Sequence, residues 1–478
     1  MQGLGGAAAP VVLLGAGAVL VLLLALFWEG AAGLLRGATL IVLALAAVAA
    51  LGIGGLPAAF HGAVLGGTLA RVTDLLAIAG AAAATVLPPP RGWGRRWSAY
   101  LGLLLWSAAG MALTGAAGNL IVLFLGIEVL SLALYVLTAF ALDDGRGAEA
   151  GFKYFVLGGL GSGLLLYGAA LSYAAGGSRA IGAAVRAAGS NALGAVGLAL
   201  LLAGLAFKLA LAPMQLWTAD VYEGAPTPVT AFMAVGTKAA AFVALARVAA
   251  GALGLSGPFA GAVLVSAVAS MFVGYLLAVR QPGLKRLLAF SGIANAGTLV
   301  LVLLVPALWV SGKAASCTCA LVAGLHAPPT WQPVALLYLI AYAVASLGVF
   351  AVVAAVSDGR QGDGMAALAG LGRRHPWLAA AFVLCLLSLA GVPPTGGFLA
   401  KLLLLQLLAG GGRPLAAVLV VLATLVALVP YFKLVVAALR PDDGEPSAPL
   451  PVGVAVVAGV AAVASVAIGI LPGAFLHG

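Results

Sequence analysis

Long apolar runs dominate the chain, and short polar segments separate them. A helix that crosses the hydrocarbon core of a bilayer needs about 20 mostly apolar residues. The pattern therefore predicts an all-α integral membrane protein with about 14 transmembrane helices. The apolar runs cover approximately residues 8–28, 36–54, 66–87, 98–116, 119–141, 151–174, 192–218, 226–250, 257–279, 283–308, 333–356, 376–409, 414–438 and 451–474.

Two of these runs are interrupted by proline. Run 192–218 contains Pro213, while run 376–409 is too long for one straight span and contains Pro393 and Pro394. Discontinuous helices in corresponding places of two halves are typical of ion sites in transporters. We therefore expect helix breaks at these prolines, within two five-helix repeats. The predicted organisation is an N-terminal three-helix segment (1–97), a first repeat (98–250), a second repeat (251–438) and a C-terminal helix (439–478).

The composition narrows the class of protein. Hydrophobic residues make up 64% of the chain and charged residues 8%, whereas soluble domains average about 45–50% and about 25%. A secreted enzyme, a nucleic-acid binder and a disordered scaffold are excluded. The three cysteines, Cys317, Cys319 and Cys385, form no Cys-x-x-Cys motif, and no nucleotide-binding or metal motif stands in a suitable context. We expect no cofactor and no metal in this chain.

The net charge of +10 reflects the distribution of basic residues over the loops. Segments that follow odd-numbered spans hold about twelve Lys and Arg, including Arg374 and Arg440, against about six on the other face, including Arg179. Because basic residues accumulate on the cytoplasmic side, the first face is predicted to be cytoplasmic. The protein is then a multi-pass protein of a bacterial plasma membrane, with both termini on the outer side.

Five ionisable side chains lie in the apolar runs without easy access to a loop: Glu128, Lys153, Lys208, Lys238 and Lys401. A charge at the centre of a membrane helix costs at least about 2.5–3.5 kcal/mol, so residues without a role would be lost from so apolar a chain. Structural explanations stay open for Glu128, as part of a buried ion pair, and for Lys401, as the filling of a cavity at the break. The mid-span position of Lys238 fits a structural explanation least well.

A structural explanation also stays open for Lys153, which lies near a predicted cytoplasmic helix end, where its long side chain can extend to water. A plainer explanation applies to another two charges. Arg71 and Asp74 lie three residues apart, which favours a local pair that neutralises both charges.

Buried lysines suit proton transfer. Burial disfavours the charged ammonium, and a nearby carboxylate favours it again. A lysine whose carboxylate partner moves or is neutralised can therefore release its proton, whereas arginine stays charged at any accessible pH. A series of such lysines, bridged by water, predicts a proton relay near the bilayer midplane.

Several stretches resemble the antiporter-like membrane subunits of respiratory complex I, the proton-pumping NADH–quinone oxidoreductase. The most specific is DVYEGAPTPVTAF, and the similarity extends over roughly 98–438. The other stretches are LFLGIEVLSLALYVLTAF (123–140), LKRLLAFSGIANAG (284–297) and SLAGVPPTGGFLAKLLLL (388–405). The resemblance implies a fold of fourteen helices with two inverted five-helix repeats. It also implies other membrane subunits and the lipid bilayer as partners, with flavin, iron–sulfur centres and quinone held by partner subunits.

The resemblance further implies a proton-relay role for matching residues. They are Glu128, Lys208, Lys238, Lys401, Lys153 and Lys285. The chain has Gln215 and Asn295 where the family often has histidine; neither amide carries a proton, but both can orient water. The chain also ends soon after its last span, without the long lateral helix of the largest such subunit, which favours a shorter member of the family.

The leading hypothesis is a proton-translocating subunit that binds no nucleic acid and no small substrate besides protons. Alternatives with the same fold are a subunit of a multi-subunit sodium/proton antiporter or of a membrane-bound hydrogenase. A self-sufficient transporter is less favoured, because no polar substrate pocket is evident. A structural subunit that has lost pumping stays open, because both histidines are missing.

Overall fold

The computed structural model describes residues 6–27, 32–52, 58–88, 96–140, 145–188, 191–251, 257–305, 331–357, 364–441 and 450–471. Within these ranges the named elements are all helices, and they form thirteen spans long and apolar enough to cross a membrane, two of which, Thr227–Ala250 and Leu284–Leu304, join consecutive named helices. The predicted span 376–409 takes the form of two shorter helices. The prediction of an all-α membrane protein is confirmed.

The chain forms two compact units. The first consists of Met1–Ala210 and Met214–Gly251, and the second of Leu211–Pro213 and Ala252–Gly478. The finer division into two inverted five-helix repeats with flanking segments stays a prediction.

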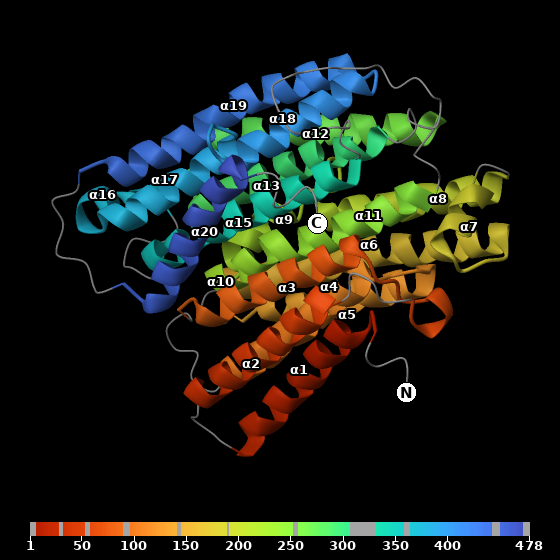
Figure 1. Cartoon of the computed structure of the whole chain (residues 1–478), viewed down its shortest axis with the longest axis horizontal. Helices are drawn as coiled ribbons and strands as arrows, with labels where there is room; N and C mark the ends of the chain where they lie inside the picture. The colour runs from red at the N-terminus through yellow and green to blue at the C-terminus, as the bar shows by residue number, and fades with distance from the viewer. Residues whose placement is uncertain are drawn as a thin grey trace. The chain divides into compact units, whose positions relative to one another are not determined.

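The first unit contains the helices that begin and end before residue 252 (Figure 1). They are α1 (Ala9–Phe27), α2 (Ala32–Leu51), η2 (Phe60–Gly62), α3 (Thr68–Val86), α4 (Arg96–Gly115), α5 (Leu120–Thr138), α6 (Gly145–Gly176), α7 (Ile181–Ala187), α8 (Ala192–Leu209), α9 (Thr218–Gly224), α10 (Thr227–Phe232), η3 (Met233–Thr237) and α11 (Lys238–Gly251). Helices α4 and α5 pack closely, as do α6 and α8. At the α4–α5 contact a Cβ on Gly110 would lie 2.3 Å from the backbone nitrogen of Leu130, so a small residue is required there.

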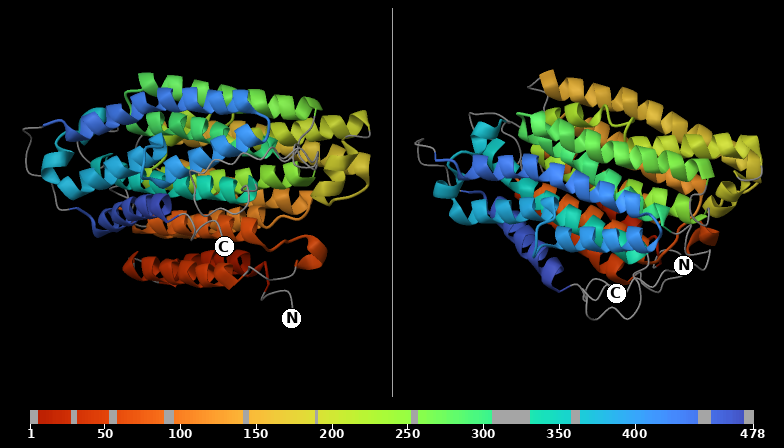
Figure 2. Two further views of the ribbon diagram at one scale, coloured as in Figure 1. Left: turned by 45° about the horizontal axis from the view of Figure 1, so that its top comes forward. Right: turned by 90° about the horizontal axis from the view of Figure 1, so that it is seen from above.

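The second unit contains the remaining helices (Figure 2). They are α12 (Gly257–Arg280), α13 (Leu284–Val300), η4 (Leu301–Leu304), α15 (Trp331–Ser357), η5 (Met365–Leu368), α16 (Leu371–Arg374), α17 (Pro376–Ala390), α18 (Gly396–Gly410), α19 (Pro414–Leu439) and α20 (Val452–Ile470). Helix α12 packs on α13, and α15 packs on α17, α18 and α20. Helix α19 runs beside α17 and α18.

Both interrupted helices end in the same way. Helix α8 ends at Leu209, and Ala210 adopts left-handed backbone angles (φ 57°) while its N–H donates to the carbonyls of the last turn. Helix α17 ends at Ala390, and Gly391 (φ 81°) makes the equivalent bonds. A left-handed residue is a common helix terminator. Pro213, Pro393 and Pro394 lie in the short segments that follow.

Candidate proton-transfer site

Lys208 lies in the last turn of α8, where only 8% of the residue is exposed. Its Nζ donates to the hydroxyl groups of Ser131 (2.9 Å), Ser162 (3.2 Å) and Tyr135 (3.4 Å). Helices α5 and α6 supply these three oxygens. The ammonium is thus surrounded by neutral acceptors that match its three N–H donors.

The hydroxyl groups can accommodate both protonation states of Lys208. The proton of Ser131 Oγ is committed to the Ile127 carbonyl at 2.6 Å, so this oxygen accepts from Lys208. Ser162 and Tyr135 have hydroxyl hydrogens that can rotate, and either can donate to a neutral amine. Lys208 can therefore lose a proton without movement of the helices around it.

Glu128 acts on Lys208 through space. On α5, Glu128, Ser131 and Tyr135 are spaced i, i+3 and i+7, so they share one face of the helix. The carboxylate of Glu128 interacts electrostatically with Lys208, while the hydrogen bonds of Lys208 go to the hydroxyl groups described above. Glu128 Oε1 is buried and has no hydrogen-bond partner within the described chain. Glu128 and Lys208 thus interact electrostatically, while hydroxyl groups accept the hydrogen bonds of the lysine.

Lys238 follows a local change in helix type. The residues Met233–Thr237 form a π-helical turn between α10 and α11, and Lys238 is the first residue of α11. Such turns are frequent at functional sites, because they alter where the following side chains project. Only 4% of Lys238 is exposed, which places an ionisable group deep in the span Thr227–Ala250.

Gln215 lies between α8 and α9, in the first unit. Its Oε1 is buried and has no hydrogen-bond partner among the described residues. A free amide oxygen beside a helix break is a site at which water can bind. The role of Gln215 in orienting water stays a prediction that this geometry favours.

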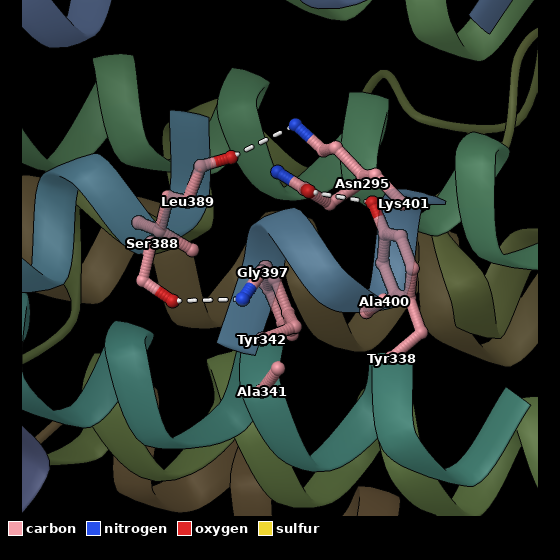
Figure 3. Close-up of a pocket in the computed structure, with 9 residues that line it drawn as sticks. All are labelled: Asn295, Tyr338, Ala341, Tyr342, Ser388, Leu389, Gly397, Ala400 and Lys401. Carbon is pink, nitrogen blue, oxygen red and sulfur yellow. Dashed lines mark hydrogen bonds between the residues drawn. The ribbon is translucent and has the colours of Figure 1, made fainter. Parts of the chain in front are cut away.

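Lys401 lies on α18 and is 6% exposed. Its Nζ donates to the carbonyl of Leu389 at 3.1 Å (Figure 3) and to that of Ala390 at 3.0 Å, the last two residues of α17. The carbonyls at a helix C-terminus carry partial negative charge, which stabilises a cation. A Cβ on Gly391 would lie 2.7 Å from Lys401 Cδ, so the glycine leaves room for the lysine. The break in the helix thus forms the binding site for the ammonium.

Asn295, on α13, lines a cavity of about 10 Å³ together with Lys401 and Tyr338 (Figure 3). This volume holds about one water molecule. Tyr338 donates to Asn295 Oδ1 at 2.9 Å, and Nδ2 donates to the Ser291 carbonyl (2.9 Å) and to Tyr431 Oη (3.2 Å). Protein groups thus fill most of the hydrogen-bonding positions of the Asn295 side chain. A water molecule that this amide orients would occupy the remaining acceptor position of Oδ1.

The other predicted relay residues differ in their surroundings. Lys153 forms ion pairs with Glu149 (2.6 Å) and Asp220 (2.8 Å), and 40% of its side chain is exposed. Such exposed pairs contribute about 0–1 kcal/mol to stability. Lys285 is the second residue of α13 and is 6% exposed.

Among the described residues, Cys385 and the metal-ligating side chains form no further site. Cys385 is a buried free thiol, and Cys317 and Cys319 lie outside the described residues. The described ranges contain no group of three metal-ligating side chains.

Sequence reasoning missed the neutral partners of Lys208 and of Asn295. Ser131 and Tyr135 could have been found from their helical spacing to Glu128, and Ser291 from its i, i+4 spacing to Asn295. Ser162, Tyr338 and Tyr431 are distant in sequence from the residues that they contact.

Comparison with known proteins identifies the class. The family described as NADH:quinone oxidoreductase/Mrp antiporter, transmembrane, matches residues 117–325 and 320–427. The chain belongs to this family of membrane proteins.

Within the family, the chain is similar to subunit N. The NADH-quinone oxidoreductase subunit N 1 of Symbiobacterium thermophilum is 40% identical over 98% of this chain and 96% of that protein. A chain of respiratory complex I from Thermus thermophilus is 36% identical over 98% of both chains, with a TM-score of 0.82. The Mrp complex of Dietzia sp. contains a chain that is 20% identical, with a TM-score of 0.80, which shows the fold alone. The resemblance to the antiporter-like subunits of complex I is confirmed.

Proposed function

We propose that this chain is the subunit N of a bacterial NADH–quinone oxidoreductase and moves protons across the membrane through buried lysines. The relay residues are Glu128, Lys208, Lys238 and Lys401, with Gln215 and Asn295 orienting water. Lys153 and Lys285 complete the set, at positions nearer to helix ends. The redox steps belong to partner subunits, which hold flavin, iron–sulfur centres and quinone.

One observation carries the proposal. In each unit a lysine buried beside a helix break donates its hydrogen bonds to neutral oxygens, namely hydroxyls for Lys208 and helix-terminal carbonyls for Lys401. A purely structural buried cation is best compensated by a carboxylate in direct contact. Neutral acceptors leave the proton easier to remove, which suits a group that must be charged and discharged in each cycle.

The similarity to subunit N favours complex I over the alternative of a sodium/proton antiporter or a membrane-bound hydrogenase. The fold alone does not separate these assemblies, since the Mrp chain superposes almost as well. The relatives that share 40% and 36% of their residues with nearly the whole chain belong to NADH–quinone oxidoreductases.

We expect Glu128→Gln to slow proton translocation several-fold, and more than Lys153→Ala does. Glu128 is half-buried and acts on Lys208, whereas Lys153 forms an exposed ion pair. The measurement is the rate of NADH-driven pH-gradient formation by the assembled complex in vesicles, with both variants in one background. Equal losses, or a larger loss from Lys153→Ala, would contradict the role of Glu128.

The orientation follows from the basic residues. We expect a thiol introduced by Arg179→Cys to react with an impermeant reagent outside intact cells, and one introduced by Arg440→Cys to be protected. Both residues are exposed. The reverse labelling pattern would overturn the topology, including the outer position of both termini.

A further inference from the structure

Asp74, on α3, is a buried charge that the relay does not use. Only 1% of the residue is exposed. The local pair with Arg71 expected from the sequence is wrong: the charged group that acts on Asp74 is Arg247, on α11. The reason is tertiary packing, because α3 contacts α11, which brings Arg247 within electrostatic range of Asp74 although the two are 173 positions apart in sequence.

Arg247 is held at the end of a third helix. Its Nε and Nη2 both donate to the carbonyl of Gly115, the last residue of α4. A Cβ on Gly115 would lie 2.6 Å from the Cβ of Thr73, the neighbour of Asp74. Arg247 and Thr73 thus both contact the end of α4, and Asp74 lies within electrostatic range of the Arg247 guanidinium.

The carboxyl group is incompletely satisfied in its charged form. Asp74 Oδ1 is buried and accepts no hydrogen bond from the described residues, and the Nε and Nη2 atoms of Arg247 donate to a carbonyl instead. A buried carboxylate that lacks donors is unfavourable. Binding a proton removes the charge and creates an O–H donor, while the guanidinium keeps its own proton. The pair can thus be neutral overall, or carry one positive charge when Asp74 is protonated.

The positions of these residues along their helices indicate the side of the membrane on which Asp74 exchanges its proton. Asp74 lies in the second turn of α3, Gly115 ends α4, and Arg247 lies in the last turns of α11. In the predicted topology all three positions are on the outer side of the membrane. Nine residues separate Lys238 from Arg247 on α11, which corresponds to about 13 Å along the helix.

We propose that Asp74 is a further proton-binding residue of the first unit, on the outer side of Lys238. Its carboxylate takes a proton from a hydronium ion of the aqueous phase, so that an O–H bond of the hydronium breaks, an O–H bond forms on Asp74, and the positive charge of Arg247 is left uncompensated. Release of that proton to water restores the neutral pair. Because a positive charge disfavours a second one nearby, protonation of Asp74 disfavours the charged form of Lys238. This inference rests on the proposed function.

The first test is spectroscopic. Infrared difference spectra of the whole complex, oxidised against NADH-reduced, should contain the carbonyl band of a protonated carboxyl group that Asp74→Asn removes. Thr85→Val serves as the matched control, since Thr85 is a buried polar residue of the same helix whose hydroxyl bonds only to the Ala81 carbonyl. A difference spectrum of Asp74→Asn identical to that of the control would overturn the proposal.

The second test is functional. We expect Asp74→Asn to slow pH-gradient formation in vesicles by about tenfold, less than the roughly 10²–10⁴-fold that a positioned proton-transfer group contributes in an enzyme, and Asp74→Glu to restore most of it. A structural role predicts the opposite order, because asparagine keeps the shape and glutamate does not. If Asp74→Asn fails to assemble, Asp74→Glu decides: pumping at the wild-type rate with a shifted carboxyl band supports the proposal, and an unshifted band overturns it.

A parallel measurement separates this inference from the proposed function. Loss of pumping in Lys238→Ala, with normal pumping in Asp74→Asn, would refute the role of Asp74 alone. Normal pumping in both variants would refute the relay as a whole.

Discussion

Replacing Lys238 with alanine is expected to leave the complex assembled and to slow proton-coupled quinone reduction by roughly 10²-fold, as for loss of a positioned proton-transfer group. Lys238 lies at the start of α11, after a π-helical turn, and is 4% exposed. Alanine has a high helix propensity, so the helix should persist without the amine. The rate of NADH-driven pH-gradient formation per assembled complex measures the effect.

Lys238→Arg tests whether charge or proton transfer matters. Arginine keeps a positive charge at every accessible pH and cannot release its proton. We therefore expect Lys238→Arg to be as slow as Lys238→Ala. Full pumping by either variant, in a complex that assembles normally on native gels, would reduce Lys238 to a packing residue.

Lys401→Met is expected to slow pumping by at least about tenfold, while Lys433→Met should have little effect. Methionine keeps the length of the side chain and removes the amine. Lys433 is a close control, because its Nζ also donates to carbonyls at a helix end, those of Val279 (3.3 Å) and Gln281 (3.1 Å). It differs in being half-buried and in lying at an unbroken helix terminus.

Comparing Lys401→Met with Lys433→Met separates a role at the broken helix from simple capping of a helix C-terminus. Both substitutions leave carbonyls at a helix C-terminus without a cation, so both should cost similar stability. A role restricted to capping predicts equal effects on pumping and on the temperature of unfolding. The relay predicts similar unfolding temperatures and a loss of pumping in Lys401→Met alone.

The fold could be predicted from the sequence because its main determinants are local. An apolar run of about 20 residues specifies a spanning helix wherever it lies, and Pro393 and Pro394 mark the interruption that separates α17 from α18. The capping asparagines are local as well: Asn119 and Asn191 accept from the backbone of the first turns of α5 and α8. Apolar periodicity gives no comparable signal for the π-helical turn before Lys238.

The partners of the buried charges depend on packing between distant segments. The sequence showed that Lys208 and Lys401 are ionisable and deep, but not that hydroxyls hold the first and helix-terminal carbonyls the second. For Asp74, the nearest charge in sequence was the wrong partner, because α11 brings Arg247 to it. Proximity in sequence alone therefore does not identify the partner of a buried charge.

The central claim is that buried lysines of this chain act in series to carry protons. The most direct test measures pH-gradient formation by vesicles containing complexes with Lys208→Met, Lys401→Met and both substitutions together. Residues that act as one path are strongly non-additive. The relay predicts a large loss from each single substitution and no further loss from the pair. Full gradients in the double variant, or small losses that multiply, would contradict the claim.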